Sequence, residues 1–129
     1  MRFLLDTHIW VWSVLEPERI GPHTLRRLES PESQCWLSPI STWELLTLVA
    51  KGKMQLDLDP REWIARAVSR FREAPLTHQI AVVSRQMQIP HQDSADRFLV
   101  ATAKVLDLTL VTADRTLLGL SAISTLANL

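Results

Sequence analysis

The residues of this chain that suggest chemistry are four carboxylates, placed at the ends of expected strands or the starts of expected helices: Asp6, Glu44, Asp96 and Asp114. Asp6 directly follows a short apolar run, and Asp114 follows a β-rich segment after one alanine. Glu44 and Asp96 each fall in the first turn of an expected helix. The carboxyl ends of parallel strands share one edge of a sheet, where α/β proteins bind ligands, so we expect the four side chains to meet there.

Four carboxylates at one site need a cation. Without one, their mutual repulsion would raise their pKa values and destabilise the fold. Mg²⁺ and Mn²⁺ take oxygen ligands and bind through a few carboxylates together with substrate phosphate oxygens. Such an ion orients and acidifies a water molecule and neutralises charge on a leaving oxygen, which is the chemistry of phosphodiester hydrolysis. The acidic set therefore predicts a metal-dependent phosphodiesterase site.

Each of these acids also has a local structural interpretation. Asp6 can cap the helix that follows it, and Asp114 can belong to a turn. Glu44 stands three residues after Ser41, the spacing of a capping box in which both side chains satisfy the helix end. We favour the shared site over these separate roles because all four acids fall where an α/β sheet places its ligand crevice.

The third acidic segment contains two aspartates, Asp93 and Asp96, spaced as an N-cap and the third residue of a helix. We expect Asp93 to serve the helix end and Asp96 to serve the site. Arg97 and Arg115 each stand next to a proposed ligand, where a guanidinium could contact a phosphate of the substrate.

The elements that must position these residues alternate between strand and helix. Strands are expected at 3–5, 35–38, 76–77, 108–112 and 122–126, and helices at 9–15, 23–30, 41–51, 60–71, 78–87 and 94–105. This alternation predicts an α/β three-layer sandwich, with a mostly parallel central sheet flanked by helices.

Composition limits the class of protein. A chain of 129 residues with 47% hydrophobic residues is expected to form one domain, 1–129. Cys35 has no partner for an intramolecular disulfide, and the sequence has neither a signal-peptide pattern nor an apolar run that could span a membrane, so a cytoplasmic location is expected. Fourteen basic residues balance fourteen acidic ones, but metal binding by four acids would leave ten against fourteen. We therefore expect nucleic-acid binding that depends on a divalent metal.

Arginine and tryptophan give weaker signals. Four arginines lie on or next to the helix expected at 60–71: Arg61, Arg66, Arg70 and Arg72. We favour a solvated helix face for them over the alternative, a row of contacts to a nucleic-acid backbone. Four tryptophans fall on expected helices, where core or subunit contacts are favoured over base stacking: Trp10, Trp12, Trp43 and Trp63.

The order of the acidic motifs resembles one known family. The segments are Phe3-Leu4-Leu5-Asp6-Thr7-His8, Ser38-Pro39-Ile40-Ser41-Thr42-Trp43-Glu44-Leu45, the run from His91-Gln92-Asp93 through Asp96-Arg97 to Ala103, and Leu110-Val111-Thr112-Ala113-Asp114. In this order they resemble the PIN-domain ribonucleases, and most of all the VapC-type toxins of bacterial toxin-antitoxin modules. Ser94 and Ala95 replace the Pro and Phe of the commoner third motif, but the acids and Arg97 are present.

This resemblance implies a PIN-like fold and a metal-dependent endoribonuclease. By the resemblance, Asp6, Glu44, Asp96 and Asp114 would hold Mg²⁺ or Mn²⁺, with Thr112 as a polar neighbour. It further implies a homodimer, silenced by a cognate antitoxin whose segment covers the active-site groove. The alternative is a catalytically inactive PIN-like module that binds RNA or protein through the same groove, with its acids serving as helix caps.

Overall fold

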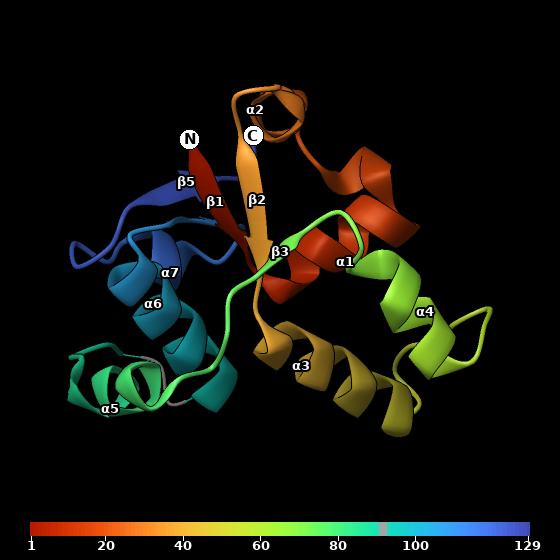
Figure 1. Cartoon of the computed structure of the whole chain (residues 1–129). Coiled ribbons are helices and arrows are strands. Elements are labelled where there is room, and N and C mark those ends of the chain that lie inside the picture. Colours follow the sequence, from red (N-terminus) through yellow and green to blue (C-terminus); the bar gives the residue numbers. More distant parts are fainter. Residues whose placement is uncertain (91–92) are drawn as a thin grey trace.

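Five parallel strands form the centre of the protein, shown in Figure 1 as a computed structural model whose described residues are 1–90 and 93–129. The strands are β1 (Arg2–Leu5), β2 (Gln34–Leu37), β3 (Arg72–Glu73), β4 (Thr109–Thr112) and β5 (Thr125–Ala127). They are ordered β3-β2-β1-β4-β5, and every neighbouring pair is parallel. His91 and Gln92, which open the third acidic motif, lie outside the described residues.

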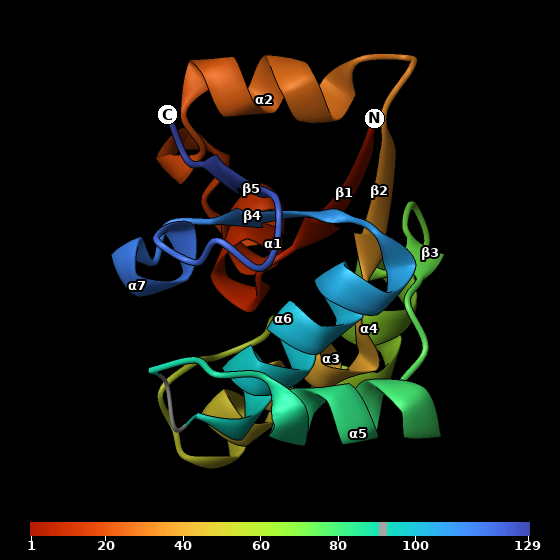
Figure 2. The ribbon, with the colours of Figure 1, turned by 90° about the vertical axis from the view of Figure 1, so that its left-hand side faces the viewer.

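Helices connect the strands and cover the sheet. They are α1 (Thr7–Leu15), the 3-10 turn η1 (Pro17–Arg19), α2 (Pro22–Glu29), α3 (Pro39–Ala50), α4 (Pro60–Ala67), α5 (His78–Gln86), α6 (Ser94–Leu106) and α7 (Arg115–Leu118). In Figure 1, α1 and α4 lie on one side of the sheet, and α5 and α6 lie on the other. Figure 2 shows α2 and α5 at opposite ends of the molecule.

Side chains of the central strand alternate between two apolar layers. Phe3 and Leu5 point into the layer beneath α1 and α4, where the rings of Trp10 and Trp63 meet edge to face at 5.8 Å between centroids. Leu4, between them in sequence, points into the layer beneath α6, which includes Leu99. The predicted three-layer α/β sandwich is confirmed, and so is the core role of Trp10 and Trp63.

One predicted strand is wrong. Residues 76–77 are not a strand, and the third strand lies instead at 72–73, where Leu37 carbonyl oxygen also accepts a bond from Ala74 N–H. The Thr77 hydroxyl accepts a bond from Ile80 N–H at 3.2 Å and so caps α5. The helix expected over 60–71 ends at Ala67, which leaves the following residues to turn the chain into β3. Of the helices in the described part of the chain, none combines the length and apolar character needed to cross a membrane.

Candidate active site

All four predicted acids line one pocket of about 280 Å³, together with Asp93 and three residues that carry no carboxylate. The lining residues are Asp6, His8, Trp12, Glu44, Asp93, Asp96, Ala113 and Asp114. They come from the C-terminal ends of β1 and β4 and from the first two turns of α1, α3 and α6. The structure thus brings together four segments that are far apart in sequence, at the edge of the sheet where the alternation of strands and helices predicts a ligand.

Asp6 is the most deeply placed of these carboxylates. It follows β1 directly, is the N-cap of α1, and has only 8% of its surface exposed. One carboxylate oxygen accepts a bond from Thr7 N–H at 2.7 Å, and the other accepts a bond from the Thr112 hydroxyl at 2.6 Å. Because Leu5 pairs with Val111 in the parallel register, the next residues of both strands, Asp6 and Thr112, come side by side.

Thr112 also connects Asp6 to Asp114. Its hydroxyl oxygen accepts a bond from Asp114 N–H at 3.0 Å, and its side chain is fully buried. Asp114 is itself the N-cap of α7 and accepts a bond from Thr116 N–H at 2.8 Å. Asp114 therefore caps a short helix, where a turn was the local expectation, and it also lines the pocket.

The capping-box interpretation of Glu44 is wrong. Helix α3 begins at Pro39 with Ser38 as its N-cap, and the Ser38 hydroxyl accepts a bond from Ile40 N–H at 3.1 Å. Proline is preorganised for the first position of a helix, so the helix starts earlier than the Ser41 pattern suggests. Glu44 consequently lies in the second turn, where its carboxylate accepts a hydrogen bond from the Thr7 hydroxyl.

Asp93 is the N-cap of α6, as expected: its carboxylate accepts a bond from Asp96 N–H at 2.9 Å. Asp96 is half-buried in the first turn of the same helix. Both side chains line the pocket. Capping by Asp93 orients the first turn that carries Asp96, so the helix start and the pocket are built from the same residues.

The two arginines next to the acids lie in different surroundings. Arg97 donates from Nε to Ser84 carbonyl oxygen at 3.0 Å and from Nη2 to Met87 carbonyl oxygen at 2.9 Å, which ties α6 to the end of α5. Arg115 is exposed at the start of α7. The structure therefore gives Arg97 a bracing contact within the protein and leaves Arg115 facing solvent beside Asp114.

The pocket disfavours negative charge. Burial raises the pKa of Asp6, opposed by the hydrogen bonds from Thr112 and Thr7, and the nearby Asp114 raises it further. Burial also raises the pKa of Glu44, opposed by the Thr7 hydroxyl, while Asp93 and Asp6 raise it further. A bound cation would offset both desolvation and repulsion, because an opposite charge nearby favours the ionised carboxylate.

The chemistry of the donor set fits a hard divalent ion. Carboxylate oxygens from four segments are the ligands that Mg²⁺ and Mn²⁺ prefer, and none of the described lining residues supplies a thiol. Across residues 1–90 and 93–129, no group of three or more His, Cys, Asp or Glu side chains is already arranged to hold a metal ion. Several carboxylate oxygens of the pocket accept hydrogen bonds: both of Asp6, one of Glu44 and one of Asp114.

Five residues that build or line this site are not among the predicted site residues: Thr7, His8, Trp12, Ser41 and Ala113. Thr7 and Ser41 are buried, and their hydroxyls lie 2.9 Å apart between α1 and α3. His8 and Trp12 are one helical turn apart and line the pocket on the same helix. The sequence does carry a signal for His8 and Trp12: they stand four residues apart on the helix that follows Asp6, so they share one face of it.

A parallel α/β sandwich with a carboxylate-lined pocket at the strand ends defines the class of protein to which this chain belongs. The family model of the PIN domain matches residues 3–121, and the chain is a member of the PIN domain family. The chain is also similar to Ribonuclease VapC22 of Mycobacterium tuberculosis, with 29% identity over 117 residues, which is 88% of each chain. The resemblance to VapC proteins is therefore confirmed.

Solved structures share the fold. A chain of the VapBC2 complex of Rickettsia felis, bound to a DNA fragment from the promoter, has a TM-score of 0.75 and 16% identity, with 98% of both chains covered. A chain of VapBC-1 from nontypeable Haemophilus influenzae has a TM-score of 0.70 and 19% identity, again with 98% of both chains covered. At such identities the likeness establishes the architecture of the whole chain.

Proposed function

We propose that this chain is a metal-dependent endoribonuclease toxin, a single PIN-like domain over residues 1–129 that hydrolyses RNA phosphodiester bonds and is inhibited by a cognate antitoxin. The observation that carries the proposal is the convergence of carboxylates from four segments on one pocket. Membership of the PIN domain family and similarity to a protein named as a ribonuclease support it.

In this proposal Asp6, Glu44, Asp96 and Asp114 hold Mg²⁺ or Mn²⁺. An ion held there would supply an acidified water and would neutralise charge at the phosphate. The protein contributes the positions of its ligands: Thr112 fixes Asp6, and its contact with Asp114 N–H sets the spacing between the acids of β1 and β4. Products with 5′-phosphate and 3′-hydroxyl ends follow from attack by water in line with the leaving 3′ oxygen.

Partners follow from the same family and from the surface. The similar structures named above are VapBC complexes, which supports a cognate antitoxin that covers the acidic groove. Large apolar side chains are exposed on three helices, with Leu15 42% exposed on α1, Trp43 58% on α3 and Val82 55% on α5. We also propose a homodimer, as the resemblance to VapC-type toxins implies. We propose a cytoplasmic location, where the RNA substrate resides.

A second candidate is a catalytically inactive PIN-like module that binds RNA or protein. It is favoured by one observation: three of the five pocket acids cap helices. In that case the acids stabilise helix ends, and removal of a charge would leave binding intact.

Mn²⁺ titration in an RNA cleavage assay separates the two candidates. Asp96→Asn removes a pocket charge from a residue that is not an N-cap, so we expect metal-dependent cleavage to be lost with the fold intact. Asp59→Asn is the matched control, because Asp59 caps α4 through Arg61 N–H at 3.0 Å, away from the pocket, and asparagine caps equally well. Cleavage by Asp96→Asn at the wild-type rate, or RNA binding without cleavage at any metal concentration, contradicts the nuclease proposal.

A further inference from the structure

One wall of the acidic pocket is aromatic. His8 and Trp12, one turn apart on α1, line it beside the carboxylates, and their ring centroids lie 6.1 Å apart with the planes tilted by 55°. His8 is exposed and Trp12 is half-buried. The carboxylates account for most of the other described lining residues, so the apolar contact surface of this pocket is concentrated on α1.

A cation lies against this wall. The guanidinium carbon of Arg19 is 4.2 Å from the centroid of the Trp12 ring, the closest of the arginine–aromatic contacts among the described residues. Arg19 Nη1 also lies 3.1 Å from a Glu16 carboxylate oxygen, and its side chain remains 53% exposed. The arrangement places positive charge beside a pocket that is otherwise negative, with N–H donors that solvent, or an anion, can reach.

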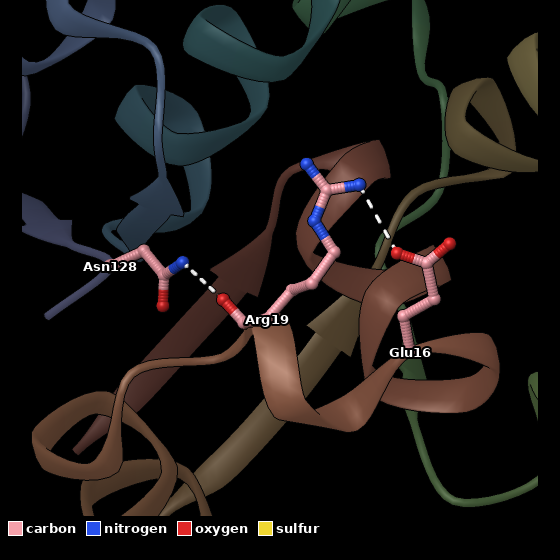
Figure 3. A network of polar contacts seen from close by, with 3 residues as sticks. All are labelled: Glu16, Arg19 and Asn128. Carbon is pink, nitrogen blue, oxygen red and sulfur yellow. Dashed lines mark hydrogen bonds and ion pairs between the residues drawn. The ribbon is translucent and has the colours of Figure 1, made fainter.

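The backbone of Arg19 is fixed from the other end of the chain. Asn128 donates from Nδ2 to Arg19 carbonyl oxygen at 2.8 Å, as Figure 3 shows, and its Oδ1 accepts a bond from Gly21 N–H at 2.7 Å. Figure 3 also shows the Arg19 side chain turned toward Glu16. The backbone of η1 is therefore held by Asn128, and the Arg19 guanidinium contacts both the Trp12 ring and the Glu16 carboxylate.

We propose that Trp12, backed by Arg19, is the stacking platform for an unpaired nucleobase next to the scissile phosphate, and that Arg19 also contacts a neighbouring phosphate. The proposal rests on RNA being the substrate of this site. A nucleotide matches both groups at once, since its base offers a flat π surface to the indole and its phosphate offers an anion to the guanidinium. The Trp12 ring and the Arg19 guanidinium also attract RNA, which the carboxylates alone cannot do because they repel phosphate.

Two fluorescent probes of equal length and charge test the platform: a twelve-nucleotide oligoadenylate and the corresponding abasic ribose-phosphate oligomer. In an Asp96→Asn background, which separates binding from cleavage, oligoadenylate should bind about tenfold more tightly than the abasic oligomer. Trp12→Leu should abolish this preference, whereas Trp12→Phe keeps a ring and should retain most of it. Arg19→Gln should weaken binding of both probes and reduce its salt dependence by about one phosphate contact.

Trp36→Leu is the matched control. Trp36 is also half-buried and lies next to guanidinium groups, with Arg2 5.2 Å and Arg72 5.8 Å from its ring centroid, but it lies on β2 and does not line the acidic pocket. Its replacement should leave the preference for oligoadenylate unchanged. Circular dichroism of each variant identifies loss of fold. If a leucine variant does not fold, the proposal is tested by Trp12→Phe, which should retain the preference, and by Arg19→Gln, which should weaken binding of both probes.

The outcomes separate this proposal from the proposed nuclease activity. A preference for oligoadenylate that survives Trp12→Leu, or equal weakening of both probes by that change, overturns the platform while metal-dependent cleavage stands. Loss of the preference in Trp12→Leu supports the platform even where the wild-type protein does not cleave RNA. If Trp12→Leu leaves RNA binding unchanged and weakens only antitoxin binding, the wall serves a protein partner and the proposal is wrong.

Discussion

The Thr7 hydroxyl donates a hydrogen bond to the Glu44 carboxylate, joining the first turn of α1 to the second turn of α3 across 37 positions of sequence. Thr7 is 1% exposed, so water does not replace this bond. The bond opposes the effect of burial on the Glu44 pKa and orients the carboxylate at the edge of the pocket. Thr7 therefore acts on the site through Glu44.

Thr7→Val should impair the site without a large change of shape, because valine has nearly the volume of threonine but cannot donate to Glu44. Removal of a group that orients a metal ligand typically lowers metal affinity or activity by about 10- to 100-fold. We expect a loss of this size in Mn²⁺ affinity, measured by calorimetry. Thr7→Ser keeps the hydroxyl and should retain affinity, and equal losses in both variants would mean that packing of the methyl group matters instead.

Removal of the buried charge of Asp6 should stabilise the metal-free protein at neutral pH. The Asp6 pKa is raised in the folded state, so the folded protein binds this proton more tightly than the unfolded chain does. The stabilisation of the folded state that comes from protonated Asp6 is present at acid pH and is lost as pH rises through the folded-state pKa. In a chelator, Asp6→Asn should therefore melt at a higher temperature than wild type at pH 7, with the difference shrinking toward acid pH. A variant that melts lower at neutral pH would show that the caps made by the carboxylate outweigh its burial.

Divalent metal should reverse the order of these two melting temperatures. A ligand that binds only the folded state at a hundred times its Kd contributes about 2.7 kcal/mol. We expect Mn²⁺ to raise the melting temperature of wild type and to have little effect on Asp6→Asn. As a control, Mn²⁺ and then a chelator are added in Ca²⁺-free buffer. The chelator should reverse the shift in melting temperature if bound metal causes it. An equal shift in both proteins would place the ion elsewhere.

The sequence predicted the acids better than the contacts that hold them. Asp6 is recognisable because an apolar strand ends directly before it, and its neighbour across the sheet follows from strand pairing. The Ser41 pattern gives Glu44 the wrong local partner, since Ser38 and Ser41 are both plausible helix starts and Pro39 at the first helical position favours Ser38. No local pattern indicates that Thr7 reaches Glu44, because that bond exists only after the two helices pack.

The missed strand has a similar physical origin. β3 consists of Arg72 and Glu73 at the edge of the sheet, both exposed, so it lacks the apolar alternation by which a strand is recognised. Its register is set by pairing with Trp36 and Leu37 of β2. Edge strands with charged side chains are common because charge discourages association with other chains. Such a strand becomes visible only when its neighbour is in place.

Arg97 and Arg115 should respond differently to removal of charge, although both stand beside a pocket acid in sequence. Arg97→Met removes two charged hydrogen bonds to the end of α5 and should lower the free energy of unfolding by about 2 kcal/mol, with faster hydrogen exchange in α5. Arg115→Gln, on an exposed side chain, should leave stability within about 0.5 kcal/mol and weaken RNA binding, with a smaller salt dependence.

The two arginine variants serve as controls for each other. Denaturation curves give stability, and fluorescence anisotropy with the oligoadenylate gives binding at several salt concentrations. If Arg97→Met leaves stability unchanged and lowers RNA affinity as Arg115→Gln does, then its contact with α5 is incidental and the side chain reaches substrate.

Gly21 is required by a close approach rather than by an unusual backbone conformation. Its φ of −61° and ψ of 146° suit any residue, but a Cβ there would lie 1.9 Å from the carbonyl carbon and 2.2 Å from the carbonyl oxygen of Leu129. These are backbone atoms, held by the bonds from Thr24 N–H to Leu129 carbonyl oxygen and from Leu129 N–H to the Thr24 hydroxyl. Any larger residue at position 21 must displace this segment from α2.

Gly21→Ala should therefore lower the free energy of unfolding by about 1–3 kcal/mol, the usual effect of forced overpacking, measured by urea denaturation. Gly119→Ala is the control, because the nearest atom to its added Cβ is 3.6 Å away and the substitution should be neutral or slightly stabilising. Since Asn128 links this segment to Arg19, Gly21→Ala should also weaken binding of both oligomers, as Arg19→Gln does. A destabilised variant that binds both oligomers as tightly as the wild type would show that Arg19 holds its place on Trp12 without Asn128.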